Sequence, residues 1–308
     1  MSASAEWISA LERMLDRAAA WNEPPNDPAA LGERLDTLDG IEMLLLGDTA
    51  AGASQATLVE LHRRAVAIQT KLASLNEALY LRLRQTIRQG AGRDALLSWV
   101  SGFTDGDDAH DEGYGALDEL IAGLLQFEQS ADIVVEQPAG MVFYQPTPAR
   151  HIFDLIRCAA LDESDVLVDL GAGLGHVPML FSICSDAYSV GVEREGSYVD
   201  CARRSAQSLG LSRVSFIQQD ARAADFSRGT LFYLYTPFGG AILRTVLDAL
   251  RNEASRREIR IATYGPCTQT MLEESWLAVI GTRDINRIVL FRSLLCDALA
   301  ASGHDDVL

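Results

Sequence analysis

The stretch Val166-Leu-Val-Asp-Leu-Gly-Ala-Gly-Leu-Gly-His176 decides the fold of this chain. Its apolar first half predicts a buried β-strand, and its glycine-rich half leads into the run VPMLFSIC, which predicts a helix. Such a turn brings backbone N–H groups and a helix N-terminus against an anionic ligand group. Gly171, Gly173 and Gly175 follow the spacing GxGxG, with Asp169 two residues before the first glycine, whereas dinucleotide sites favour GxGxxG. The stretch therefore predicts a ligand site between strand and helix and disfavours a dinucleotide as the ligand.

Short β-branched runs alternate with helical stretches from about residue 132 onward, which predicts parallel strands joined by crossover helices. Only GTRDIN separates the last two strands, which is too short for a crossover helix, so we expect an antiparallel hairpin there. The sequence thus predicts an α/β fold: a seven-stranded, mostly parallel sheet with helices on both faces and a terminal antiparallel hairpin. The expected strands are Val166–Asp169, Tyr188–Glu193, Val214–Gln218, Leu231–Tyr235, Ile259–Tyr264, Trp276–Ile280 and Arg287–Phe291.

Residues 1–130 predict an all-α domain that precedes this α/β domain, which we place at residues 131–308. Asp27 followed by Pro28 is typical of a helix start, and the strongest pattern predicts one long helix from Ser54 to Arg88 that ends at Gly90. The apolar seam of this helix fits either an intramolecular bundle or a homodimer. We expect the helical domain to bind the substrate, to act as a lid or to dimerise. The seam consists of Leu58, Leu61, Ala65, Ile68, Leu72, Leu75 and Leu79.

The composition disfavours several classes of function. Hydrophobic residues make up 48% of the chain, but no stretch reaches the roughly 18 apolar residues of a membrane span. The N-terminus also lacks a signal-peptide pattern, so we expect a cytoplasmic protein without a membrane partner. The net charge of −17 disfavours nucleic acid as a partner, and Lys71, the only lysine, lies in no glycine-rich turn, which disfavours a P-loop. The cysteine spacing does not suit zinc, and residues 101–115 lack the glutamate of an EF-hand, so we expect no metal.

Acidic residues follow the next two expected strands as well. Glu193 ends the second strand, where doubly wound folds place a carboxylate that accepts the ribose hydroxyls. Asp220 and Ala221 follow the third strand, where an acidic side chain can accept the adenine amino group. Together with Asp169, these acids suit a ligand that carries a sulfonium, an ammonium and a ribose, and they suit a pyrophosphate poorly.

These motifs resemble those of the class I S-adenosylmethionine-dependent methyltransferases. The resemblance covers residues 166–292, with the glycine motif at VDLGAGLG and a terminal hairpin typical of that family. It implies S-adenosyl-L-methionine as the cofactor: Asp169 and the glycine loop hold its methionine part, Glu193 its ribose, and Asp220 with Ala221 its adenine. The loop residues are Gly171, Ala172, Gly173 and Gly175.

The segment Val142-Phe-Tyr-Gln-Pro-Thr-Pro148 is similar to the loop before the first strand in the Dot1-like histone-lysine methyltransferases. In that family a Tyr and a Thr-Pro pair help to enclose the cofactor, which implies the same for Tyr144 and Thr147. The alternative is a proline-rich linker in which Thr147 only caps the helix ARHIFDLIRCAAL. The likeness implies no histone substrate, because it rests on a short loop and the cofactor motifs.

The fourth strand ends in Tyr235-Thr-Pro-Phe238, where the resemblance places residues beside the transferred methyl group. Members of the family that methylate amines often have Asn or Asp before Pro-Pro-Tyr or Pro-Pro-Phe, so a tyrosine at the first position weighs against a nitrogen acceptor. A Pro-Phe turn can still present carbonyl groups and an aromatic face beside a sulfonium. We therefore name Tyr235, Pro237, Phe238 and Tyr144 as candidate catalytic residues, and Tyr235 also as a cofactor contact. The alternative is that Tyr235 and Phe238 only pack the end of the sheet.

The sequence thus predicts an enzyme that transfers a methyl group to an unidentified acceptor, with an amine of a protein or small molecule as one option. The alternative is a non-catalytic protein that binds S-adenosylmethionine or acts as a scaffold. A nicotinamide-dependent oxidoreductase is disfavoured by Asp169, the GxGxG spacing and the hairpin. His176 and His151 are interpreted as structural residues of their helices, with a role as a base as the alternative.

Overall fold

The computed structural model describes residues 3–46, 54–104, 114–127, 145–235 and 238–294. The chain divides into two compact units. The helical unit comprises Met1–Gln89 with Ala95–Leu124, and the sheet unit comprises Gly90–Asp94 with Leu125–Leu308. Each unit has its own buried core.

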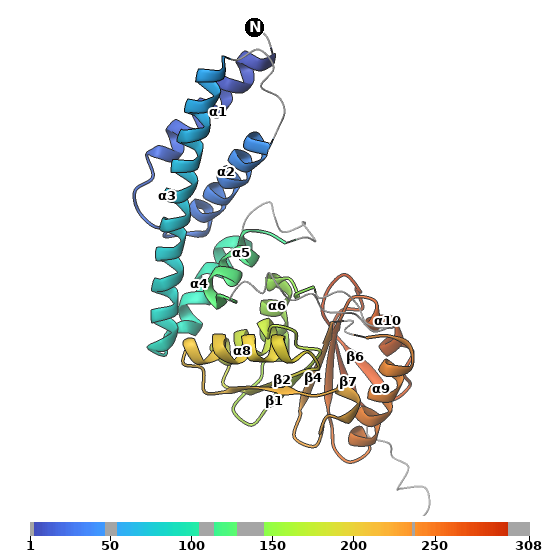
Figure 1. Cartoon of the computed structure of the whole chain (residues 1–308). Coiled ribbons are helices and arrows are strands. Elements are labelled where there is room, and N and C mark those ends of the chain that lie inside the picture. Colours follow the sequence, from blue (N-terminus) through green and yellow to red (C-terminus); the bar gives the residue numbers. More distant parts are fainter. Residues whose placement is uncertain (1–2, 47–53, 105–113, 128–144, 236–237, 295–308) are drawn as a thin grey trace, which may run out of the picture. The chain divides into compact units, whose positions relative to one another are not determined.

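Three long helices form the core of the helical unit (Figure 1). The side chain of Asp27 accepts the N–H of Ala30 at 2.8 Å, so this helix start is capped as the sequence predicts. The side chain of Ser54 accepts the N–H of Thr57 at 3.2 Å and caps the longest helix, which begins one residue after the expected Ser54. The apolar seam of the longest helix packs against the other two, which is the intramolecular bundle; a homodimer through these helices stays a prediction. The helices are α1 (Ala3–Ala19), α2 (Pro28–Leu46), α3 (Gln55–Arg88), α4 (Gly92–Thr104) and α5 (Ala116–Leu125).

The sheet unit contains seven strands in the order β3-β2-β1-β4-β5-β7-β6. The first five pair in parallel, and β7 pairs antiparallel with both β5 and β6. This is the predicted α/β fold with a terminal antiparallel hairpin. The strands are β1 (Val166–Leu170), β2 (Tyr188–Glu193), β3 (Val214–Gln218), β4 (Leu231–Tyr235), β5 (Arg260–Tyr264), β6 (Leu277–Ile280) and β7 (Val289–Ser293).

The largest difference from the predicted strands is at β7, which begins two residues later than the expected Arg287 and overlaps the expected strand at 289–291. A turn occupies the residues before it: the carboxylate of Asp284 accepts the N–H of Asn286 at 3.0 Å, and the carbonyl of Asp284 accepts the N–H of Arg287 at 3.1 Å. These bonds bend the backbone, so Arg287 cannot pair with a strand.

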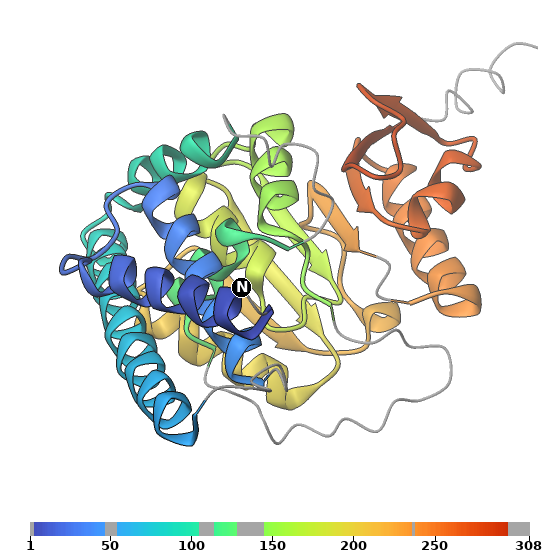
Figure 2. The ribbon, with the colours of Figure 1, turned by 90° about the horizontal axis from the view of Figure 1, so that it is seen from above.

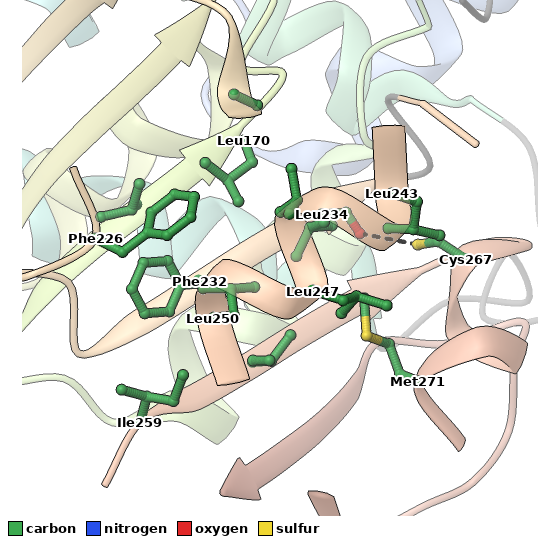
Figure 3. Packing of buried hydrophobic residues seen from close by; sticks show 14 of the residues in the cluster. Leu170, Phe226, Phe232, Leu234, Leu243, Leu247, Leu250, Ile259, Cys267 and Met271 are labelled. Carbon is green, nitrogen blue, oxygen red and sulfur yellow. Dashed lines mark hydrogen bonds between the residues drawn. The ribbon is translucent and has the colours of Figure 1, made fainter. Parts of the chain in front are cut away.

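Helices cover both faces of the sheet. On one face, Phe232 and Leu234 of β4 pack with Leu243, Leu247 and Leu250 of α9 (Figure 3). Ile261 of β5 belongs to the same core. In Figure 2, where the C-terminal elements are orange to red, α10 lies against β6 on this side of the unit. The helices are α6 (Ala149–Ala159), α7 (His176–Cys184), α8 (Gly196–Ser208), α9 (Gly240–Ala254) and α10 (Cys267–Leu272), with a short 3₁₀ helix, η2, at Ala221–Ala223.

The opposite face of the sheet carries the polar residues. Side chains alternate between the two faces along a strand, so Asp169 and Tyr233 point away from the α9 core, and these two residues pair across β1 and β4. The helix α7 contacts β1, β2 and β3, and α8 contacts β2 and β3. The face that does not build the α9 core therefore contains the candidate site.

We expect Phe232→Ala to lower the free energy of unfolding of the sheet unit by about 3–5 kcal/mol, because it opens a cavity between the sheet and α9. Phe232 is fully buried, whereas Ile217 on the edge strand β3 is 42% exposed. Ile217→Thr, which keeps a β-branched side chain, is the control and should change the value by no more than about 0.5 kcal/mol. Denaturant unfolding of both variants measures this, and equal effects would contradict the assignment of the core.

Candidate functional site

The carboxyl ends of the five parallel strands meet at one edge of the sheet, which is where doubly wound folds bind ligands. All of the acidic residues that the sequence predicts for the site lie at or within two residues of these strand ends. Tyr264 ends β5 at the same edge, although the sequence analysis assigned it no role. The residues at this edge are Asp169, Glu193, Asp220, Tyr235 and Tyr264.

The glycine turn after β1 is folded against the end of β2. Its glycines have left-handed backbone angles, with φ of 89° at Gly171, 53° at Gly173 and 85° at Gly175, which favour glycine. The N–H groups of Gly171 and Ala172 donate to the carbonyl of Val192 at 2.9 and 3.1 Å. The turn therefore needs its glycines for its backbone path, and this path starts α7 at the sheet edge.

Gly175 has a second reason to lack a side chain. A Cβ at this position would overlap the ring of Phe216 from β3, and it would lie 3.3 Å from the Cβ of Ala202 on α8. The aromatic ring thus fills the space beside the turn, where helix and strand approach closely.

Glu193 binds the glycine turn through its carboxylate. Its Oε2 accepts the N–H of Gly173 at 2.9 Å, and its Oε1 accepts the N–H of Glu195 at 2.8 Å. An ionised carboxylate has about four lone-pair positions, so each oxygen retains capacity for one more donor. The predicted ribose contact is therefore compatible with these two bonds, which fix the orientation of the side chain.

Asp169 is buried, with 4% of its surface exposed. Within the described part of the chain its carboxylate makes no hydrogen bond and no ion pair. Burial, with the negative charge of Glu193 as a second cause, raises the pKa of the Asp169 carboxyl well above its usual value. An anion in such a place lacks a counter-charge, and a cationic ligand would supply one.

Asp220 lies at the edge as predicted, but its carboxylate already has a partner. The guanidinium of Arg222 donates to both of its oxygens, at 3.0 and 2.6 Å, and the N–H of Arg222 donates to Oδ1 at 2.9 Å. The side-chain bond from Arg222 is the main cause that lowers the pKa of Asp220 to about 2. The pair is partly exposed, so its exchange for an adenine amino group would cost little. The next residue, Ala221, packs into the α9 core.

Thr147 does not cap α6, which corrects the alternative reading of this residue. The N-cap of α6 is Pro148, without a side-chain hydrogen bond, and the hydroxyl of Thr147 instead bonds the hydroxyl of Tyr233 at 2.8 Å. Because Tyr233 is the β4 neighbour of Asp169, this bond places the segment before α6 beside the candidate site. Tyr144, the other residue of the Dot1-like resemblance, lies outside the described residues, and that resemblance stays a prediction.

The residues predicted at the end of β4 differ in their surroundings, which bear on whether each lies at the site or only packs the end of the sheet. Tyr235 is half-buried and its ring lies 4.9 Å from that of Tyr264. Phe238 belongs to the apolar core that α9 covers, which favours packing and not catalysis for this residue. Pro237 lies outside the described residues.

Two histidines that the sequence left as structural differ in their surroundings. His176 begins α7, where its ring lies 4.5 Å from that of Phe127 and where burial lowers its pKa to about 4. His151, in the first turn of α6, is buried with its ring 4.3 Å from that of Tyr264. Its spacing of four residues from Leu155 and eight from Ala159 is the sequence signal that places it on the buried face of α6.

Among the described residues, no group of three or more His, Cys, Asp or Glu side chains could hold a metal ion. None of the described helices is long and apolar enough to cross a membrane. The segment considered as a calcium loop lies largely outside the described residues.

Comparison with known proteins finds similarity in fold. No protein-family model and no curated protein matches the chain. An RNA methyltransferase from Salinibacter ruber in complex with S-adenosyl-L-homocysteine is 24% identical, with 48% of this chain and 92% of that chain covered, at a TM-score of 0.39. The tRNA methyltransferase TrmK of B. subtilis is 16% identical over 51% of this chain and 70% of its own, at a TM-score of 0.38. A mutant of MtNAS in complex with S-adenosylmethionine is 13% identical, covers 94% of this chain and 98% of its own, and has a TM-score of 0.39.

We expect Asp169→Asn to stabilise the ligand-free protein, and to do so more at pH 8 than at pH 5. An unfolded aspartate titrates near about pH 3.9, whereas the folded pKa is raised. Between these two values the folded state binds more protons than the unfolded state, so the stability of the wild type falls as the pH rises. Asparagine does not titrate and removes this loss.

Thermal melting of both proteins at the two pH values measures the effect. Asp248→Asn, at an exposed position of α9, is the matched control and should change the melting temperature little at either pH. A melting temperature of Asp169→Asn below that of the wild type at pH 8 would show that Asp169 is stabilised by its surroundings.

We expect Gly175→Ala to destabilise the sheet unit by about 2 kcal/mol or more, since alanine is strained at positive φ and its methyl group meets Phe216. Gly32→Ala is the control, because nothing lies within 4 Å of its Cβ position on α2. That change should leave stability unchanged or raise it by up to about 1 kcal/mol. Denaturant unfolding distinguishes the two, and an equal effect would refute the special role of Gly175.

Proposed function

We propose that this chain binds S-adenosylmethionine at the carboxyl edge of its sheet and transfers the methyl group to an acceptor beside Tyr235. The observation that carries the proposal is the buried carboxylate of Asp169, which has no partner in the described part of the chain and lies at the glycine turn. A ligand with positive charges offsets the cost of this anion.

The residues at the edge fit the parts of this cofactor. Asp169 would face its cationic groups, and Glu193 has lone pairs left for ribose hydroxyls. A pyrophosphate fits poorly, because two carboxylates approach the turn and raise the electrostatic cost of another anion. Asp220 would reach the adenine only after exchange of its bond to Arg222.

The cofactor supplies an activated methyl group on a sulfonium, so the protein chiefly has to align the acceptor and exclude water. Alignment alone contributes about 7–11 kcal/mol in favourable cases. The rings of Tyr235 and Tyr264 offer flat surfaces for this, and the faces of such rings also attract cations. The bond between Thr147 and Tyr233 holds the segment before α6 against the same face.

We expect the purified protein to bind S-adenosylmethionine and S-adenosylhomocysteine saturably in calorimetric titrations and not to bind NAD. Asp169→Asn should weaken binding of both at least about tenfold, because one charge-assisted contact is lost. In the wild type, binding should tighten as the pH rises through the raised pKa of Asp169, because the cation needs the ionised carboxylate. Asp248→Asn is the control and should bind like the wild type.

Each other outcome has a defined meaning. A preference for NAD, or no binding by a folded wild type, would overturn the proposal. Binding of S-adenosylmethionine without formation of S-adenosylhomocysteine in the presence of a broad set of amines and hydroxyl compounds would favour the non-catalytic alternative.

A further inference from the structure

The side chain of His151 is the buried polar group that the proposed function leaves unexplained. It is 5% exposed, and among the described residues neither its Nδ1 nor its Nε2 has a hydrogen-bond partner. An imidazole always has hydrogen-bonding capacity at both nitrogens, and a buried polar group without a partner is uncommon and costly. A ligand is one way in which such a group obtains its partner.

The surroundings of His151 lie at the candidate site. Its ring is 4.3 Å from the ring of Tyr264, which is in turn 4.9 Å from the ring of Tyr235. Tyr264 and Tyr235 are paired neighbours at the ends of β5 and β4. The three rings therefore form a row at the carboxyl edge of the sheet, on the face that also carries Tyr233 and Asp169.

The charges near His151 leave the imidazole neutral. Burial is the main cause that lowers its pKa to about 4, and the positive charges of Arg150 and Arg287 add to the effect. The nearby Asp154 opposes it, but its carboxylate is bonded to Arg157 and Arg287 and does not bond the ring. A neutral ring suits the vicinity of a sulfonium, because an imidazolium would repel it.

We propose that His151 binds the methyl acceptor: a ring nitrogen accepts a hydrogen bond from an N–H or O–H group of a planar acceptor. The flat body of the acceptor packs against the rings of Tyr264 and Tyr235, as aromatic groups commonly pair with one another. This inference rests on the proposed function and adds the class of acceptor, a ring compound with a hydrogen-bond donor. It also assigns a binding role to a histidine that its sequence position marks only as part of a helix.

Phenol and toluene are suitable probes, because they have similar rings and only phenol donates a hydrogen bond. We measure the affinity of each by NMR titration of the full-length protein with ¹⁵N-labelled histidine, with and without saturating S-adenosylhomocysteine. Phenol should shift the His151 nitrogen signals, and toluene should not. The ratio of phenol to toluene affinity should fall about tenfold in His151→Phe, the worth of one hydrogen bond.

His151→Phe should fold, because phenylalanine keeps a ring on Tyr264 and removes both unpaired nitrogens. His62→Phe, at an exposed position of α3, is the matched control and should keep the affinity ratio of the wild type. The nitrogen shifts of the wild type test the proposal independently of any variant.

The two proposals fail in different ways. If the wild type binds no S-adenosylhomocysteine, the proposed function is overturned. If it binds this compound but His151→Phe leaves the affinity ratio unchanged, the role of His151 is overturned. The same holds if phenol leaves the His151 signals unmoved or if neither fragment binds, and His151 is then a structural imidazole.

Discussion

The hydrogen bond from the N–H of Gly173 to the carboxylate of Glu193 is the interaction on which the rest of the site depends. It connects the turn after β1 to the end of β2. The N–H groups of Gly171 and Ala172, which donate to the carbonyl of Val192, connect the same two segments. The path of this turn requires three glycines, and it starts α7 directly at the sheet edge. These hydrogen bonds set the orientation of the Glu193 side chain and the distance at which a ligand can approach the turn.

The same arrangement concentrates negative charge, and this has a cost for the fold. Asp169 lies buried near Glu193 without a positive partner among the described residues, so the folded state holds a carboxyl group that resists ionisation. A protein selected for stability alone would have no reason to retain this residue, because a buried unpaired charge is among the most expensive groups in a core. Unfavourable groups of this kind are characteristic of binding sites, where a ligand of opposite charge offsets the cost of the buried charge.

The two faces of the sheet differ in the residues that they carry. The face under α9 is mostly apolar and packs Phe232, Leu234 and Ile261 into one core. The other face carries tyrosines at the ends of β4 and β5. The segment before α6 is held against this face by the hydrogen bond between Thr147 and Tyr233. Because side chains alternate along a strand, a single strand such as β4 contributes residues both to the apolar core and to the face with the tyrosines. After the end of β4, Phe238 packs into the apolar core, whereas Tyr235 lies on the opposite face beside Tyr264.

The sequence by itself determined the alternation of strands and helices, the terminal hairpin, the glycine turn and the acids at the strand ends, because these depend on local periodicity, glycine content and chain order. It placed β7 two residues too early, because the turn around Asp284 depends on side-chain bonds and not on β propensity. Only the structure decided that Asp220 is paired with Arg222, that Thr147 bonds Tyr233, and that His151 lies against Tyr264 without a hydrogen bond to any described residue. The last two relations join residues 86 and 113 positions apart, and such distant contacts arise only when the whole sheet and α6 pack together.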